Sequence, residues 1–225
     1  MTSQTFTITA SPYRRAGRAA IASGIIGIIA VSFLIAYLVF RSDSMEKGML
    51  MANIHDAGVM LQFLFMIPAV FGLYELSQKR SPGMGRATLY IGIGAIFFTV
   101  LFLLLGLVKV IADVLYMFPQ GIFGAWLIVI CWRMKNVLSR GLRWFGIVVG
   151  FGLALVGSFP LQYAIFVDKI ILQVPAASDE AVAKIPISHA NMILHQVLWI
   201  GSPLGVLTLP FWTLLLGRRL LRERN

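Results

Sequence analysis

Three histidines are the side chains of this chain best suited to chemistry, because imidazole binds metals and changes its charge near neutral pH. They are His55, which precedes Asp56, and His189 and His195. A hydrolytic metal site needs about three protein ligands and an open position for water, and no HExxH or comparable spacing surrounds these residues. On one helix, the separation of His189 and His195 would turn them about 120° apart. A metal site built from the three histidines is therefore an alternative and not the main hypothesis.

Other cofactor chemistry finds little support in the residue types. A haem carrier needs axial histidines on facing helices, and three histidines provide at most one such pair. Cys131 is the only cysteine, so neither an intramolecular disulfide nor a cysteine-based zinc site can form. Its position in an apolar run beside Trp132 favours a small buried side chain. We expect no bound cofactor.

A second group of candidates consists of polar residues near the ends of long apolar runs. His55 and Gln62 have the heptad separation that places two residues on one helical face. Lys109 and Asp113 have the i,i+4 spacing of a helical ion pair. Ionisable residues in membrane helices usually face the bundle interior or a water-filled cavity, so we predict a polar vestibule. Its candidate residues are His55, Asp56, Gln62, Lys109, Asp113, Gln120, Gln162, His189, Asn191 and His195.

The vestibule hypothesis requires polar residues of different helices to meet. Asn191 and His195 also have i,i+4 spacing, and they begin the last apolar run. We expect them to converge with His55 and Asp56, whose carboxylate would favour the charged imidazole and create a protonation switch near neutral pH. The alternative is that each polar residue tethers its own helix end to headgroups and water.

Long apolar runs provide the helices that would carry these residues. Hydrophobic residues make up 59% of the 225 residues and charged residues 12%, about half the charged fraction of soluble domains. A bilayer crossing takes about 20 apolar residues. The first two runs cover 19–40 and 54–76, the next two share 87–132 around a tight turn between Lys109 and Pro119, and the last two cover 144–168 and 191–216. The predicted fold is all-α, a polytopic membrane protein of six transmembrane helices, with the sixth bent at its prolines.

The distribution of charge predicts how the helices are threaded. Of the 19 Lys and Arg, 14 fall on one side of the proposed membrane with two of the nine acidic residues, which gives +12 there and −2 on the other side. Cytoplasmic loops carry the Lys and Arg excess, so both termini are predicted to be cytoplasmic (N-in/C-in). All ten vestibule candidates then lie near the outer face. The basic side suits anionic lipid. The sequence has no basic patch interleaved with aromatic residues, which is the pattern that would indicate nucleic-acid binding.

The chain is predicted to form a single domain. Residues 19–216 form the six-helix transmembrane domain, between cytoplasmic basic tails at 1–18 and 217–225. The first apolar run is longer than a signal-peptide core and has no convincing cleavage site, which indicates an uncleaved anchor. GxxxG spacings at Gly146 and Gly150 and at Gly201 and Gly205 allow close helix approach. We expect them to pack helices within one chain, and the oligomeric state is left open.

Two stretches carry a family resemblance. Residues 72–76 (GLYEL) close the second apolar run, and residues 124–130 (GAWLIVI) are followed by 138–146 (LSRGLRWFG). With the six-span layout, they resemble bacterial integral membrane proteins of the domain-of-unknown-function 4386 type. The resemblance implies a six-helix protein of the bacterial inner membrane, and it assigns no reaction, cofactor or site residue.

The main hypothesis is a non-enzymatic role in the plasma membrane, as an accessory, sensor or lipid-contacting protein with an outward-facing polar vestibule. The alternative is a metal-dependent intramembrane hydrolase that acts at the outer face through His55, His189 and His195.

Overall fold

The computed structural model describes residues 12–40, 44–80, 85–135, 137–174 and 188–222, and every regular element in these ranges is helical. Six helices in the described ranges are long and apolar enough to cross a membrane. The predicted all-α fold with six membrane-spanning helices is therefore confirmed. The elements are α1 (Pro12–Phe40), α2 (Met45–Arg80), α3 (Arg86–Leu107), η1 (Asp113–Tyr116), α4 (Met117–Arg133), α5 (Arg140–Phe166), η2 (Lys169–Leu172), α7 (His189–Ser202), η3 (Pro203–Leu207) and α8 (Leu209–Arg222).

The first two helices are longer than the sequence predicted. α1 begins at Pro12 rather than near residue 19, and α2 runs from Met45 to Arg80 rather than over 54–76. The apolar runs mark only the part of each helix that suits hydrocarbon, and helical hydrogen bonding continues beyond it where tertiary packing buries one face. Tyr13 and Ala16 supply such a face at the start of α1, because both are buried among the helices.

The third and fourth spans are separated by a tight turn between Lys109 and Pro119, as predicted. α3 ends at Leu107 and α4 begins at Met117. Pro119 lies in the first turn of α4, where a missing N–H removes no helical hydrogen bond. The sixth span is interrupted at Pro203, where a five-residue π-helical segment, η3, separates α7 from α8. The prolines of this span therefore do break its regular helix.

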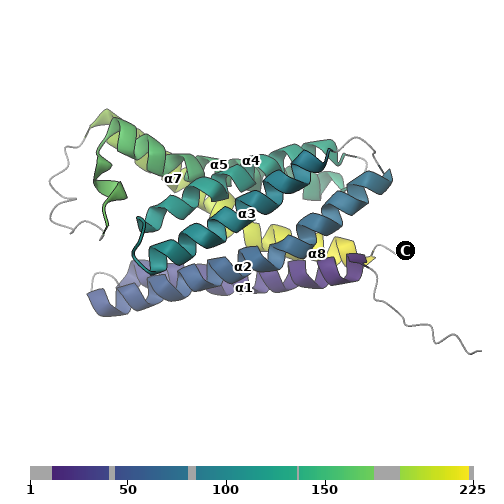
Figure 1. Cartoon of the computed structure of the whole chain (residues 1–225), viewed down its shortest axis with the longest axis horizontal. Coiled ribbons are helices and arrows are strands. Elements are labelled where there is room, and N and C mark those ends of the chain that lie inside the picture. Colours follow the sequence, from purple (N-terminus) through teal and green to yellow (C-terminus); the bar gives the residue numbers. More distant parts are fainter. Residues whose placement is uncertain (1–11, 41–43, 81–84, 136, 175–187, 223–225) are drawn as a thin grey trace, which may run out of the picture.

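The helices form a ring in which each contacts its neighbour in sequence (Figure 1). α1 packs on α2, α2 on α3, α3 on α4 and α4 on α5, and the sixth span closes the ring between α5 and α1. α1 begins and α8 ends at one end of the bundle, which we name the terminal end. The opposite end, which we name the far end, contains η1, η2 and the start of α7. Helix ends that the charge pattern assigns to opposite sides of a membrane thus lie at opposite ends of the bundle.

The contact between α1 and α2, which we name the α1–α2 seam, has the heptad spacing of a left-handed helix pair. Small residues of α1 are buried at alternating intervals of four and three, and a set of mostly larger residues of α2 follows the same pattern. The α1 residues are Ala16, Ala20, Ser23, Gly27 and Ala30, and the α2 residues are His55, Val59, Gln62, Met66, Ala69 and Leu73.

Glycines bring other helices of the ring equally close. Gly150 of α5 lies against Gly124 of α4, and Gly205 of the sixth span lies against Gly152 of α5. An added Cβ at Gly150 would lie 2.6 Å from the Gly124 carbonyl oxygen, and real Cβ atoms do not come that close to a neighbour. Both GxxxG spacings therefore serve contacts within one chain, as predicted.

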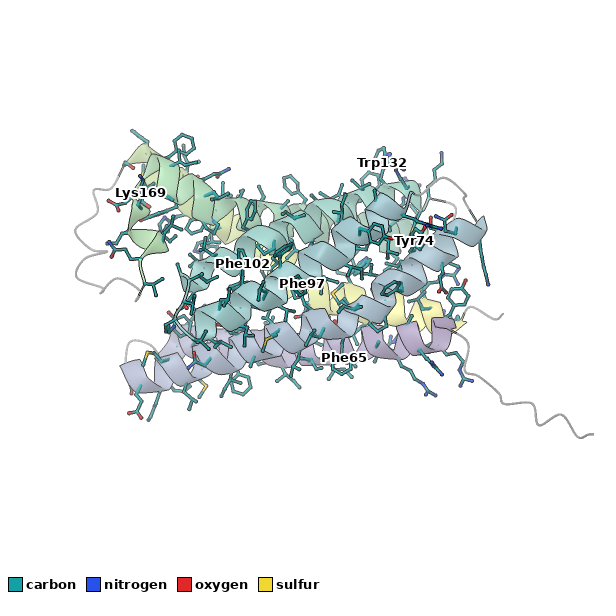
Figure 2. All side chains as sticks on the ribbon, viewed as in Figure 1. Phe65, Tyr74, Phe97, Phe102, Trp132 and Lys169 are labelled. Atoms are coloured by element: carbon teal, nitrogen blue, oxygen red, sulfur yellow. The ribbon has the colours of Figure 1, made fainter. Side chains whose placement is uncertain are left out.

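The buried apolar side chains of the described residues form two hydrophobic cores. In the main core, Phe63 of α2 meets Phe123 of α4 edge to face with 5.5 Å between ring centroids, and Phe123 stacks on Trp126. A satellite core at the far end is built from Phe159 and Tyr163 of α5 with Leu194 of α7. Between the two ends, apolar side chains also cover the outside of the bundle, as Phe65 and Phe97 illustrate in Figure 2.

Candidate functional site

An ion pair at the far end is the best-defined polar contact that the sequence predicted. The Lys109 Nζ lies 2.7 Å from the Asp113 Oδ2, and both side chains are about half exposed. Asp113 is held at the first position of η1, close to Gly106 of α3. The predicted pairing of Lys109 with Asp113 is confirmed.

The backbone that positions Lys109 is unusual for a residue with a side chain. Lys109 has φ 57°, and it is the one described non-glycine residue with a positive φ. Its N–H donates to the Gly106 carbonyl at 2.8 Å and the Val110 N–H donates to the Leu105 carbonyl at 2.9 Å. These two bonds define a Schellman motif, whose left-handed position is usually glycine. A lysine there costs about 1–2 kcal/mol, and its ammonium is thereby directed to Asp113.

Two further ionisable side chains lie near this pair, one on α2 and one on η1 itself. Asp56 of α2 lies within electrostatic range of both Asp113 and Lys109. Tyr116, the last residue of η1, lies within electrostatic range of both carboxylates. We name Asp56, Lys109, Asp113 and Tyr116 the far-end polar cluster. Its one direct contact is the ion pair of Lys109 with Asp113, and its two carboxylates outnumber its one ammonium group, which favours cations at this end of the bundle.

His55 is not part of this cluster but lies in the α1–α2 seam. It is buried, and its Nδ1 donates a hydrogen bond of 2.9 Å to the Ala30 carbonyl of α1. Gln62 shares that face of α2, as predicted, and its amide lies against Gly27. The Ser23 hydroxyl donates to the backbone carbonyl of Gln62 at 2.9 Å. These bonds tie two membrane helices together, because backbone and side-chain polar groups in hydrocarbon need partners.

Among the polar residues of α7, His195 lies against α5. The His195 Nδ1 donates to the Asn191 carbonyl of its own helix at 2.9 Å, and its ring lies edge-on to Phe159 and Tyr163, 6.3 Å from each centroid. His189 is exposed at the start of α7, and the Ser188 hydroxyl caps this helix by accepting from the Asn191 N–H at 3.2 Å.

The expected convergence of His55 and Asp56 with Asn191 and His195 is therefore wrong. Helical spacing correctly placed His55 and Gln62 on one face of α2, but that face meets α1, whereas His195 faces α5. The described residues contain no group of three His, Cys, Asp or Glu that could hold a metal, so the three histidines do not assemble as a ligand set. Among the remaining candidates, Gln120 is buried in α4 and Gln162 is half-buried in α5.

Sequence reasoning missed Tyr116 and the approach of Asp56 to Lys109 and Asp113. A signal for Tyr116 exists, since it follows Asp113 at the i,i+3 spacing that places two residues on one face. No local spacing connects Asp56 to the ion pair, because the packing of α2 on α3 brings them together.

The terminal end carries basic and aromatic side chains. Trp132 of α4 and Trp144 of α5 meet edge to face with 6.4 Å between centroids, and both are exposed (Figure 2 labels Trp132). The Arg143 guanidinium lies 6.0 Å from the Trp144 ring centroid. On the other side of the ring, the Lys79 ammonium lies 5.0 Å from the Tyr13 ring centroid. Tryptophans at one level beside cationic side chains are typical of a membrane–water interface.

The six apolar helices indicate a multi-pass membrane protein, with lipid contact over its apolar exterior. Compared with models of protein families, with curated proteins and with solved structures, the chain matches none. Its function is therefore inferred from the geometry of the two ends.

Proposed function

We propose that this chain is a multi-pass protein of the bacterial plasma membrane, that both termini are cytoplasmic, and that its role is non-enzymatic contact with anionic lipid in the cytoplasmic leaflet. The observation that carries the proposal is the surface formed at the terminal end by Trp132, Trp144 and Arg143. The resemblance to proteins of the domain-of-unknown-function 4386 type agrees with this location and remains a proposal with it.

Charge and depth both support lipid as the partner of this surface. Trp132 and Trp144 present amphipathic rings to the outside of the bundle at the end of their helices, where indole favours the headgroup level. The neighbouring loop and helix ends carry exposed Arg133, Lys135 and Arg140. Each Lys or Arg near an anionic leaflet contributes about 1 kcal/mol of attraction, so a cluster of this size holds anionic headgroups next to the indoles.

Under this threading the far-end polar cluster faces the periplasm. The two carboxylates of Asp56 and Asp113 outnumber the single ammonium group of Lys109, so the cluster has a net negative charge. A net negative cluster suits the outer side of the membrane, where loops carry no excess of Lys and Arg. We propose this cluster, rather than the ten-residue vestibule, as the polar site of the outer face.

Lipid retention tests the lipid-contacting role. The purified protein is equilibrated in nanodiscs of mixed phosphatidylglycerol and phosphatidylcholine, and the lipids that remain bound after detergent release are counted by native mass spectrometry. Arg140→Gln with Arg143→Gln removes two terminal-end charges. We expect the preference for phosphatidylglycerol to fall about 30-fold, since two charges contribute about 2 kcal/mol.

The matched control removes two exposed charges from the far end, Lys47→Gln with Lys169→Gln (Figure 2 labels Lys169). This variant should retain the wild-type preference for phosphatidylglycerol. An equal loss in both variants, or no preference in the unchanged protein, would contradict the proposed role.

A further inference from the structure

The sixth span closes the helix ring unevenly. In the terminal half, α8 packs on α1 at close range, with Gly17 against Gly217 and Gly24 against Pro210 and Leu214. In the far half, α7 packs on α5, and among the described residues it has no comparable contact with α1. The ring is thus closed between α8 and α1 but not between α7 and α1.

The change of partner falls at η3, where the helix is irregular. Pro203 has no N–H to donate to the carbonyl one turn earlier, and Pro210 lies in the first turn of α8, where proline suits the start of a new helix. Between them the hydrogen bonding is π-helical. Gly205 of this segment lies directly against Gly152 of α5. This close backbone contact holds η3 on α5, so a change in the direction of α7 would begin at this segment.

Fewer residues are buried in α7 than in α8, the two helices of the sixth span. Leu194 and Gly201 are the buried residues of α7, whereas seven residues of α8 are buried. Trp199 of α7 is 81% exposed. Across the opening, α1 exposes Ile35 and Leu38. These exposed side chains are apolar and uncharged, so bringing Trp199 closer to Ile35 and Leu38 would exchange lipid contact for protein contact without burying a charge.

We propose that α7 is a hinged arm that pivots at η3 between its position on α5 and a position closer to α1, while α8 stays fixed on α1. The satellite core holds the arm on α5 through Leu194 and through the His195 ring between Phe159 and Tyr163. Hinges of this kind absorb the motion in a few residues at the end of a helix. The movement would open and close the far half of the ring toward the surrounding lipid.

Spin-label distances in the full chain test the hinge. In a Cys131→Ala background reconstituted in nanodiscs, one label is placed on α1 at Ser32→Cys. It is paired with Gln196→Cys on α7, or with Arg222→Cys on α8 as the control; all three positions are exposed. Pulsed electron paramagnetic resonance should give a Ser32–Gln196 distance distribution roughly twofold wider than that of Ser32–Arg222. Equal widths would overturn the proposal.

Two proline variants sharpen this test. Pro203→Ala with Pro210→Ala restores the donors of the sixth span and should narrow the Ser32–Gln196 distribution. Pro68→Ala, at an exposed proline inside the continuous helix α2, should leave it unchanged. An unchanged width in the Pro203→Ala, Pro210→Ala variant would also overturn the hinge. If that variant does not fold, the comparison of the two label pairs in the unmodified span still decides.

Discussion

The α1–α2 seam and the contact between α5 and α7 both join apolar helices, yet they do so differently. In the seam, five small residues of α1 are buried at heptad spacing along the helix. In α7, two residues are buried. Lipid tails solvate an apolar side chain as well as a neighbouring helix does, so close approach and interhelical hydrogen bonds decide which helices associate. The comparison shows that close approach and interhelical hydrogen bonds hold the seam together, whereas the satellite core and Gly201 hold α7 on α5.

Hydrogen bonds also distinguish the α1–α2 seam from the contact between α5 and α7. Ser23 and His55 each donate across the seam to a backbone carbonyl of the partner helix. His195 donates within α7 and meets α5 only through ring contacts. Bonds between helices set the register of a pair, whereas ring contacts tolerate small shifts. The register of α1 on α2 is therefore specified more sharply than that of α7 on α5.

The largest expected difference comes from truncating one leucine in each region. Leu73→Ala in the seam removes a side chain that is 1% exposed and should lower the free energy of unfolding by about 3 kcal/mol or more. Leu194→Ala in the satellite core should lower it by less than about 2 kcal/mol, because the small core relaxes around the cavity. Denaturant unfolding in mixed micelles measures both. Equal losses would show that the two contacts are equally tight.

An intermediate effect is expected from filling the space between α1 and α2. A Cβ at Gly27 would lie 2.7 Å from the Gln62 amide, so Gly27→Leu should destabilise the protein by about 1–3 kcal/mol. Gly94→Leu in α3 is the matched control, since nothing lies within 4 Å of a Cβ there. The melting temperature in detergent should fall for Gly27→Leu only. A tolerated leucine at residue 27 would argue against close packing in the seam.

The smallest effect separates backbone strain from ion pairing at Lys109. Lys109→Gly relieves the positive φ and loses the pair with Asp113; we expect a net gain of up to about 1 kcal/mol, because exposed pairs contribute only a few tenths. Lys109→Met keeps the strain and loses the pair, so it should cost a few tenths of a kcal/mol. Unfolding curves of both variants, with Asp113→Leu to close a double-mutant cycle, measure the two contributions. Destabilisation by glycine would mean that the left-handed turn carries little strain.

Local patterns in the sequence predicted more of the fold than of the candidate site. Apolar length revealed all six spans, and i,i+4 spacing revealed the pairing of Lys109 with Asp113. Spacing also placed His55 and Gln62 on one face of α2. It could not show which helix that face meets, because helix neighbours depend on small-residue contacts such as Gly58 with Ala30. For this reason the meeting of His55 with His195 was predicted wrongly.

The approach of Asp56 to the ion pair was missed for a related reason. Asp56 lies near the start of α2 and Lys109 just beyond the end of α3, so their meeting depends on the antiparallel packing of two long helices. Charge counting assigned both residues to the same side of the membrane, which is a necessary condition for contact. The charge count does not show how α2 is oriented about its own axis. In the structure, that orientation places Asp56 on the side of α2 that faces α3.

Cysteine accessibility from the two sides of the membrane tests the proposed threading most directly. The proposed lipid contact and the proposed periplasmic position of the far-end polar cluster both depend on this threading. In a Cys131→Ala background, Lys47→Cys at the far end and Lys135→Cys at the terminal end place one exposed thiol at each end of the bundle. A membrane-impermeant maleimide should label Lys47→Cys in intact spheroplasts and Lys135→Cys only after permeabilisation. Labelling of Lys135→Cys in intact spheroplasts, with Lys47→Cys protected, would contradict the account.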